Sequence, residues 1–274
     1  MRIEKRWQIK KPEETIVSTL QSSLSINANL CRLLVNRDIT NFDEAKAFFR
    51  PTLEQLHDPY LMKGMHIAVK RIDEAINNQE NILILGDYDV DGTTSVAVVY
   101  SFLIKYLEQF NKKNKLLYYI PHRYHEGYGI STKAIDYAHS QQVKLIITLD
   151  CGTKSIDKIA YAKSLGIDCI VCDHHNPGEV LPDTIALLNP KQEDCQYPFK
   201  ELSACGIGYK LICALSTYWE IPANSVNEHL DLVATSIAAD IVPLVGENRI
   251  LTYYGLQKAN TSPTTAILTL KQIS

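Results

Sequence analysis

Three aspartates at alternate positions, Asp87, Asp89 and Asp91, form the most chemically suggestive segment of the chain, and Gly92 follows them directly. Carboxylates held this close together repel one another strongly unless they take up protons or bind cations. The spacing resembles the start of an EF-hand calcium loop, but that loop requires a glutamate where this chain has Val98. A solvated acidic turn is the simpler alternative for an isolated segment of this kind.

Further acids and imidazoles occur downstream: Asp150 follows one apolar segment, and Asp173, His174 and His175 follow the next. Oxygen ligands combined with imidazole favour Mn²⁺, with Mg²⁺ as a weaker substitute. Zinc fits less well, because structural zinc sites prefer thiolates. Asp240 ends an apolar helical run, where its carboxylate needs a helix cap, an arginine or a metal ion as a partner. These residues predict a divalent-metal site if the fold brings them together.

The elements that must position these residues begin at Ile82, where short apolar runs start to alternate with amphipathic helical patterns. The apolar runs predict strands at 82–85, 116–120, 145–149, 167–171 and 185–188. Such alternation is typical of a doubly wound, mainly parallel α/β sheet that is buried on both faces. Ligands bind outside the carboxyl ends of the strands in such sheets, and the acids and imidazoles lie there.

The chain on either side of this region has helical patterns. Residues 10–80 read as helices, and the chain turns helical again after Cys205. We therefore expect a helical lead-in over residues 1–80 and an α/β domain over residues 81–274 with a helical C-terminal part.

The composition excludes several classes of protein. With 46% hydrophobic and 22% charged residues the chain can bury a core, so it is neither disordered nor a small disulfide scaffold. No stretch reaches the roughly 18 apolar residues of a membrane helix, and the seven cysteines fit reduced thiols in a cytoplasmic protein. The net charge of −3 gives no basic footprint for nucleic acid, but two divalent cations on the carboxylates would more than cancel it.

Four segments together resemble the motifs of the DHH phosphoesterase superfamily: residues 86–92, 149–150, 173–175 and 239–240. Within that superfamily, further segments are similar to the RecJ family of bacterial 5′→3′ exonucleases, which are specific for single-stranded DNA. These segments are 121–123, 127–129, 189–190 and 203–208. The motifs occur in the family's order along most of the chain.

The resemblance implies a two-metal phosphodiesterase that prefers Mn²⁺, acts on single-stranded DNA and serves DNA repair and recombination. It also implies single-strand-binding protein and a helicase as partners. The metal ligands that it implies are Asp89, Asp91, Asp150, His174 and Asp240. We expect Asp150 to bridge the two ions, because it follows a central predicted strand.

The resemblance places other side chains beside the ions. Asp87 lies next to the ligands, and Asp173 is expected to orient an imidazole through a hydrogen bond. His175 is expected to contact phosphate or to protonate the leaving oxygen, with a hydrogen-bonded core histidine as the alternative.

Two sets of residues are expected to bind the substrate. Arg123 suits a bidentate phosphate contact, with a plain surface arginine as the alternative. Gly206 and Gly208 open a helix whose amides would receive a phosphate, and a simple tight turn explains them almost as well.

Two departures from the family pattern are visible. Some relatives carry a histidine where this chain has Leu85, which affects the occupancy of one metal site. Full relatives also continue into a second conserved domain and an oligonucleotide-binding fold, which we expect to be absent here. Two other functions keep the same fold: a phosphoesterase acting on oligoribonucleotides, cyclic dinucleotides or pyrophosphate, and an inactive DNA-binding scaffold that has lost metal ligands.

Overall fold

The computed structural model describes residues 6–273, and the chain divides into two compact units, Met1–Leu53 and Glu54–Ser274. The larger unit begins well before the predicted domain boundary. The reason is helix α4 (Met65–Asn77), which packs against the sheet and against α8 (Ala204–Tyr218) of that unit. No helix among the described residues is long and apolar enough to cross a membrane.

The smaller unit is helical, as predicted. Its described residues form α1 (Glu14–Leu24), α2 (Ala28–Val35) and α3 (Phe42–Phe49). The side chains of Asn27 and Asn41 cap the second and third helices by accepting hydrogen bonds from backbone amides of the first turn. The apolar faces of the helices form a small core of their own.

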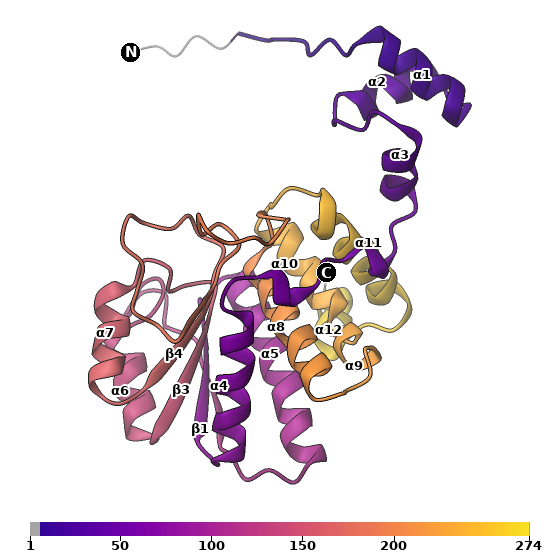
Figure 1. The fold of residues 1–274 in the computed structure, drawn as a ribbon. Helices are drawn as coiled ribbons and strands as arrows, with labels where there is room; N and C mark the ends of the chain where they lie inside the picture. The colour runs from indigo at the N-terminus through magenta and orange to yellow at the C-terminus, as the bar shows by residue number, and fades with distance from the viewer. Residues whose placement is uncertain (1–5, 274) are drawn as a thin grey trace. The chain divides into compact units, whose positions relative to one another are not determined.

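The described part of the larger unit is built on a five-stranded parallel sheet with the order β2-β1-β3-β4-β5 (Figure 1). The strands are β1 (Asn81–Gly86), β2 (Leu116–Tyr119), β3 (Val143–Leu149), β4 (Asp168–Cys172) and β5 (Ala186–Leu188). Their ends differ from those of the predicted apolar runs by only a residue or two. The predicted doubly wound parallel sheet is therefore confirmed.

Helices cover both faces of this sheet (Figure 1). The other helices are α5 (Val90–Gln109), α6 (Thr132–Ser140), α7 (Ile156–Ser164), α9 (Asn224–Asn227), α10 (Leu230–Ala239), α11 (Gly246–Thr261) and α12 (Thr265–Ile273), with short 3₁₀ helices at Leu53–Gln55 and Pro59–Leu61. The helices α6 and α7 lie on one face with Leu83 and Leu85 in their core, whereas α4, α5 and α8 lie on the other. Beyond them, α10 packs against α5, α8 and α11, which gives the predicted helical C-terminal part.

The register of the sheet aligns the carboxyl ends of its three central strands. Gly86 of β1 pairs with Leu149 of β3, and Leu149 pairs with Cys172 of β4. The residues that directly follow these strand ends are Asp87, Asp150 and Asp173. Three aspartates from distant parts of the sequence therefore leave the sheet side by side at one edge.

Candidate metal centre

The turn between β1 and α5 holds the first two aspartates. Asp89 caps α5, and its Oδ1 accepts a hydrogen bond from the amide of Gly92 at 2.9 Å. Asp87 is buried, and its Oδ1 accepts a hydrogen bond from the amide of Gly129 at 3.1 Å. A Cβ atom at position 92 would lie 2.4 Å from the carbonyl oxygen of Asp87, so only glycine lets α5 begin this close to the end of the strand.

Asp91 lies on α5 and accepts hydrogen bonds from residues of α8 and α10. Its Oδ2 accepts a hydrogen bond from the amide of Ala204 at 2.8 Å, and its Oδ1 accepts one from the amide of Cys205 at 2.9 Å. The hydroxyl of Ser236 on α10 donates a further hydrogen bond to Oδ1 at 2.7 Å. The carboxylate thus fills the N-terminus of α8 while its Oδ2 also lies 3.7 Å from Nε2 of His174.

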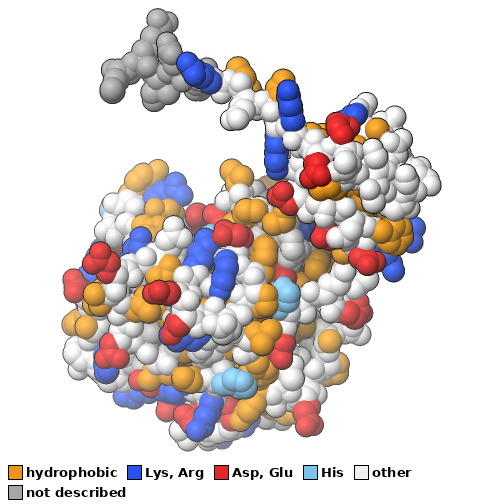
Figure 2. Space-filling view, turned by 45° about the horizontal axis from the view of Figure 1, so that its top comes forward, with side chains coloured by type: hydrophobic (Ala, Val, Ile, Leu, Met, Phe, Trp, Pro, Cys, Tyr) orange, Lys and Arg blue, Asp and Glu red, His pale blue; other side chains and the backbone are white. Residues whose placement is uncertain are grey.

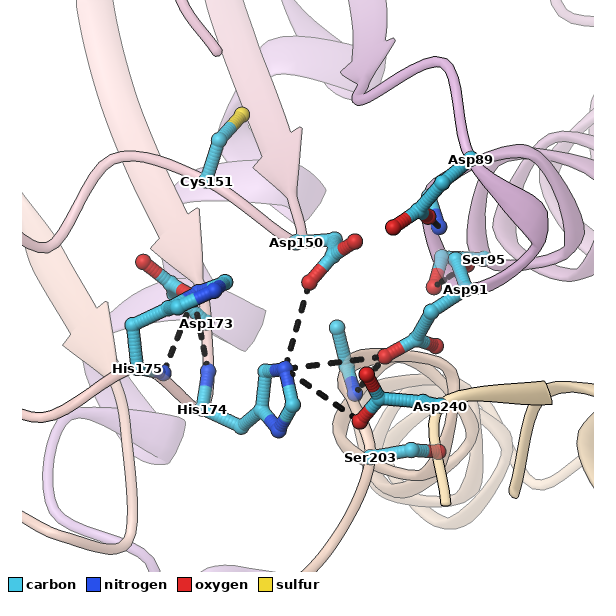
Figure 3. Close-up of polar contacts among 12 residues, drawn as sticks. Asp89, Asp91, Ser95, Asp150, Cys151, Asp173, His174, His175, Ser203 and Asp240 are labelled. Atoms are coloured by element: carbon cyan, nitrogen blue, oxygen red, sulfur yellow. Dashed lines mark hydrogen bonds and ion pairs between the residues drawn. The ribbon is translucent and has the colours of Figure 1, made fainter. Parts of the chain in front are cut away.

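His174 lies at the centre of the cluster (Figure 3). Its Nε2 is 3.3 Å from Oδ1 of Asp150 and 3.7 Å from Oδ2 of Asp240, in addition to its contact with Asp91. Asp240 is the C-terminal cap residue of α10, so that helix delivers the last carboxylate to the edge of the sheet. One ring nitrogen therefore faces carboxylates from three different elements.

All the predicted metal ligands come together in overlapping groups whose candidate ligand atoms lie within 4.8 Å of one another. The groups are Asp87, Asp89 and Asp150; Asp91, His174 and Asp240; and Asp150, His174 and His175. Asp150 and His174 each belong to two of the groups. Two predicted neighbours, Asp87 and His175, also lie close enough to act as ligands.

The electrostatics of the cluster favour a bound cation. Burial, with the nearby charges of Asp91 and Asp89, raises the pKa of Asp150 far above the ordinary range of an aspartate. Burial also raises the pKa of Asp87 and of Asp240. The buried atoms Oδ2 of Asp87 and Oδ1 of Asp150 have no hydrogen-bond partner among the described residues. A divalent ion would satisfy both oxygens, and the oxygen and imidazole ligands fit such an ion.

Asp173 contacts the second histidine of the triplet. Its Oδ1 lies 2.7 Å from Nδ1 of His175 and accepts a hydrogen bond from the amide of His174 at 2.8 Å, while Oδ2 accepts one from the amide of Thr153 at 2.9 Å. Burial opposes the charge, but the hydrogen bonds from His175 and Thr153 hold the pKa of Asp173 at about 2. The same contact raises the pKa of His175, whose side chain is 45% exposed.

Arg123 lies near the acidic turn on the exposed side of the site. Its guanidinium carbon is 4.4 Å from the ring centre of Tyr88, which sits between Asp87 and Asp89 in the sequence. The structure therefore brings Arg123 to the edge of the metal centre, with its guanidinium stacked on an aromatic ring.

The expectation that amides near Gly206 and Gly208 receive a phosphate is not supported. The amides of Ala204 and Cys205 donate to Asp91, and the amide of Gly206 donates to Oγ of Ser203 at 3.1 Å. Gly208 is buried, and a Cβ atom there would lie 3.1 Å from the Val99 side chain. The helix terminus is already occupied by a carboxylate, so the two glycines serve the close packing of α8.

Other residues, for which the sequence predicted no role, make hydrogen bonds around the site. The side-chain amide of Asn189 donates to the carbonyl oxygen of His175 at 2.8 Å and to Oγ1 of Thr153 at 3.1 Å. Tyr128 donates to the carbonyl oxygen of Asp150 at 2.8 Å. The motifs that contain Asn189 and Tyr128 stand out in the sequence, whereas nothing there marks Thr153.

A family model described as the N-terminal domain of the DHH family matches residues 81–237, more than half of the chain. The chain belongs to the DHH family. This DHH chain is 41% identical over 253 residues to the single-stranded-DNA-specific exonuclease RecJ of Bacillus subtilis (strain 168), and 37% identical over 262 residues to that of Escherichia coli (strain K12). Each match covers 92% of this chain but only 31% and 44% of the two relatives, so the chain spans less than half of their length.

Solved structures of RecJ proteins share the fold. A crystal structure of exonuclease RecJ bound to manganese matches with a TM-score of 0.66 and 30% identity, over 77% of this chain and 51% of that one. RecJ from Thermus thermophilus in complex with Mn²⁺ matches 97% of this chain and 36% of that one with a TM-score of 0.78, and at 23% identity it shows the fold alone. The DHH chain thus has the fold of proteins that bind manganese, together with acids and imidazoles that could hold a metal ion.

Proposed function

We propose that this DHH chain is the catalytic part of a metal-dependent exonuclease that hydrolyses single-stranded DNA from the 5′ end. The observation that carries the proposal is the cluster at the strand ends, where Asp150 and His174 meet carboxylates from α5 and α10. The cluster buries carboxylate oxygens that have no hydrogen-bond partner among the described residues, and the chain is similar to RecJ exonucleases over most of its length. We propose residues 81–274, which contain all of these side chains, as the catalytic domain.

Two divalent ions would be held by the overlapping groups of ligands at this edge. The ligands that we propose are Asp89, Asp91, Asp150, His174 and Asp240, with Asp87 beside them. Asp150 belongs to two of these groups and is the proposed bridging ligand. When bound, the ions supply Lewis acidity and positive charge for phosphodiester hydrolysis. Imidazole among the oxygen ligands supports Mn²⁺ over Mg²⁺.

Residues of the chain itself would bind and orient the phosphodiester. Asp173 holds Nδ1 of His175, so we assign the contact with a phosphate oxygen, or the proton transfer to the leaving oxygen, to Nε2, which also lies 3.2 Å from the hydroxyl oxygen of Tyr128. Arg123 presents its guanidinium from the face of Tyr88 and suits a second phosphate contact. The side chains of His175 and Arg123 both lie on the exposed side of the cluster, where a DNA strand has access.

The affinity of this chain for a long DNA strand would be weak. On the face drawn in Figure 2, lysine and arginine side chains are interspersed with acidic and apolar ones. Non-specific affinity for nucleic acid comes mainly from basic grooves and stacking platforms. We therefore propose a high KM and strong salt sensitivity for this chain. The resemblance alone supports a cytoplasmic repair role with single-strand-binding protein and a helicase as partners.

The test is degradation of end-labelled single strands, duplexes, dinucleotides and pyrophosphate with Mn²⁺, with Mg²⁺ and with EDTA. We expect 5′→3′ cleavage of single strands with Mn²⁺, slower cleavage with Mg²⁺ and none with EDTA. Asp150→Ala should abolish turnover and weaken metal binding, whereas His175→Ala should lower kcat and leave metal content unchanged. Asp194→Ala, an exposed acid paired with Lys63, is the control. Faster hydrolysis of dinucleotides or pyrophosphate than of strands would replace the proposal by a small-substrate phosphoesterase.

A further inference from the structure

The segment Gly127–Gly129 lies against the metal centre and has no part in the chemistry proposed above. Its two glycines have φ angles of +79° and +81°, in the left-handed region that other residues rarely adopt. This conformation lets the amide of Gly129 donate to Oδ1 of Asp87 while Tyr128 projects toward the ends of two other strands. One short segment therefore contacts residues that follow β1, β3 and β4.

The hydroxyl of Tyr128 touches two of the proposed functional residues. It donates a hydrogen bond to the carbonyl oxygen of Asp150 at 2.8 Å. The same oxygen lies 3.2 Å from Nε2 and 3.4 Å from Nδ1 of His175, and the two ring planes are inclined at 76° with centres 5.8 Å apart. Because the oxygen is almost equally far from both nitrogens, it contacts the imidazole ring as a whole and is not directed at a single nitrogen.

His175 needs such a contact. Asp173 fixes its Nδ1 and the ring of His174 lies against it with centres 4.8 Å apart, but almost half of the side chain is exposed. Tyr128 supplies a further contact on the ring from another element. It is anchored to the backbone of Asp150, so the imidazole is held at a set position relative to the proposed bridging ligand.

The phenol ring of Tyr128 contacts Tyr88, the residue on which Arg123 lies. Its centre is 6.4 Å from that of Tyr88 with the planes at 88°, an edge-to-face pair, and Tyr88 carries the guanidinium of Arg123 on its face. The hydroxyl and the ring therefore face different parts of the site: the hydroxyl faces His175 and Asp150, and the ring faces the support of Arg123.

We propose that Tyr128 is a positioning residue, whose hydroxyl fixes the His175 imidazole against the Asp150 turn and whose ring supports the Tyr88–Arg123 pair. The proposal rests on the proposed function, because His175 and Arg123 are assigned to the substrate there. A displacement of about 1 Å of a reacting group can lower the rate by about 100-fold. The hydroxyl is thus expected to act on kcat, and the ring on KM.

Two substitutions separate the hydroxyl from the ring. Tyr128→Phe removes only the hydroxyl, and we expect kcat on single-stranded DNA to fall roughly 10- to 100-fold while KM and Mn²⁺ affinity stay within about twofold. Tyr128→Leu also removes the ring, and we expect KM to rise in addition. The matched control is Tyr60→Phe, because Tyr60 also donates its hydroxyl to a carbonyl oxygen, that of Ala214 at 2.9 Å, away from the cluster. A kcat of Tyr128→Phe equal to that of Tyr60→Phe would overturn the proposal.

A second measurement does not depend on nuclease activity. Imidazole ¹⁵N–¹H correlations of the metal-free protein report the environment of each histidine ring, and His175→Gln identifies the signal of His175. We expect Tyr128→Phe to shift or broaden that signal and Tyr60→Phe to leave it in place. If the wild-type chain cleaves no strand, the proposed function fails, and the spectra alone decide the positioning: an unchanged His175 signal in Tyr128→Phe refutes it.

Discussion

Glu247 and Asp150 are both almost completely buried carboxylates, and the larger unit surrounds them in opposite ways. Glu247 receives an ion pair from Nζ of Lys210 at 2.6 Å, a hydrogen bond from the hydroxyl of Tyr197 at 2.7 Å and another from the amide of His57 at 2.9 Å. Asp150 has a buried oxygen without a hydrogen-bond partner among the described residues, and carboxylates are the main charges near it.

The difference shows which buried charge the chain can neutralise by itself. The group formed by Lys210, Glu247, Tyr197 and His57 is complete, since every oxygen of the carboxylate has a donor from the protein. The buried Oδ1 of Asp150 and Oδ2 of Asp87 lack such donors among the described residues, and a cation that enters from solution would supply the missing positive charge. The two regions are also connected, because Asn248, next to Glu247, donates to the carbonyl oxygen of Pro243 in the loop that follows Asp240.

The largest expected effect comes from breaking the complete group. Lys210→Met leaves a buried, unpaired carboxylate, and we expect the free energy of unfolding in urea to fall by about 3–5 kcal/mol. Lys63→Met is the control, because its partner Asp194 is exposed and such pairs contribute about 1 kcal/mol or less. Adding Glu247→Gln to Lys210→Met should restore part of the loss. If Lys210→Met lowered the free energy of unfolding by less than Lys63→Met does, the ion pair between Lys210 and Glu247 would contribute little to stability.

His229 offers a third way to bury a titratable group, since it remains neutral. Its Nε2 is buried without a hydrogen-bond partner among the described residues, and burial, helped by the charge of Lys105, lowers the pKa of His229 to about 4. The unfolded chain binds the proton near pH 6.5 and the folded chain does not. Stability is therefore complete above pH 6.5 and decreases as the pH falls toward 4.

The matching experiment compares urea unfolding of wild type and His229→Gln at about pH 7.5 and about pH 4.5. We expect wild type to lose about 2–3 kcal/mol more than the variant between these pH values. His139→Gln, at an exposed position, is the control. Equal pH dependence of wild type and His229→Gln would mean that His229 is protonated in the folded chain.

A smaller change in stability, of the opposite sign, is expected in the cluster around Asp150. We call it the open cluster, because the buried Oδ1 of Asp150 has no hydrogen-bond partner among the described residues. Asp150→Asn removes one of the crowded carboxylates at nearly constant shape, so we expect the metal-free protein to gain on the order of 1 kcal/mol. The stabilisation of wild type by Mn²⁺, measured as a rise in melting temperature, should be lost in the variant. A metal-free Asp150→Asn less stable than wild type would contradict the claim that the cluster is held under repulsion.

The sequence predicted the open cluster better than the complete group, for a physical reason. Acids at the ends of apolar runs are placed by the sheet itself, so their meeting follows from the topology. Lys210 and Glu247 lie on different helices with no pattern that joins them, and the contact depends on how α8 and α11 pack. The error at Gly206 has a similar origin, because the carboxylate that fills the helix N-terminus is Asp91, far away in the sequence.

Two residues of the metal cluster and its loop have left-handed backbone angles. Asp150 has φ = 62° and Ile241, directly after Asp240, has φ = 59°. Aspartate tolerates the left-handed region, but for a β-branched residue it costs about 1–2 kcal/mol. The side chain of Ile241 is 86% exposed, so little burial offsets this cost.

Ile241→Gly should therefore stabilise the metal-free protein by about 0.5 kcal/mol, the remainder after the greater freedom of glycine in the unfolded chain is subtracted. Ile67→Gly is the control with the opposite sign, because Ile67 is also exposed but lies in α4, where glycine costs about 1 kcal/mol. Melting temperatures with EDTA and with Mn²⁺ give the answer. If Ile241→Gly raises the melting temperature with EDTA and also with Mn²⁺, the strain lies in the loop alone. A gain that disappears with Mn²⁺ would mean that the strained backbone is part of how Asp240 reaches the ion.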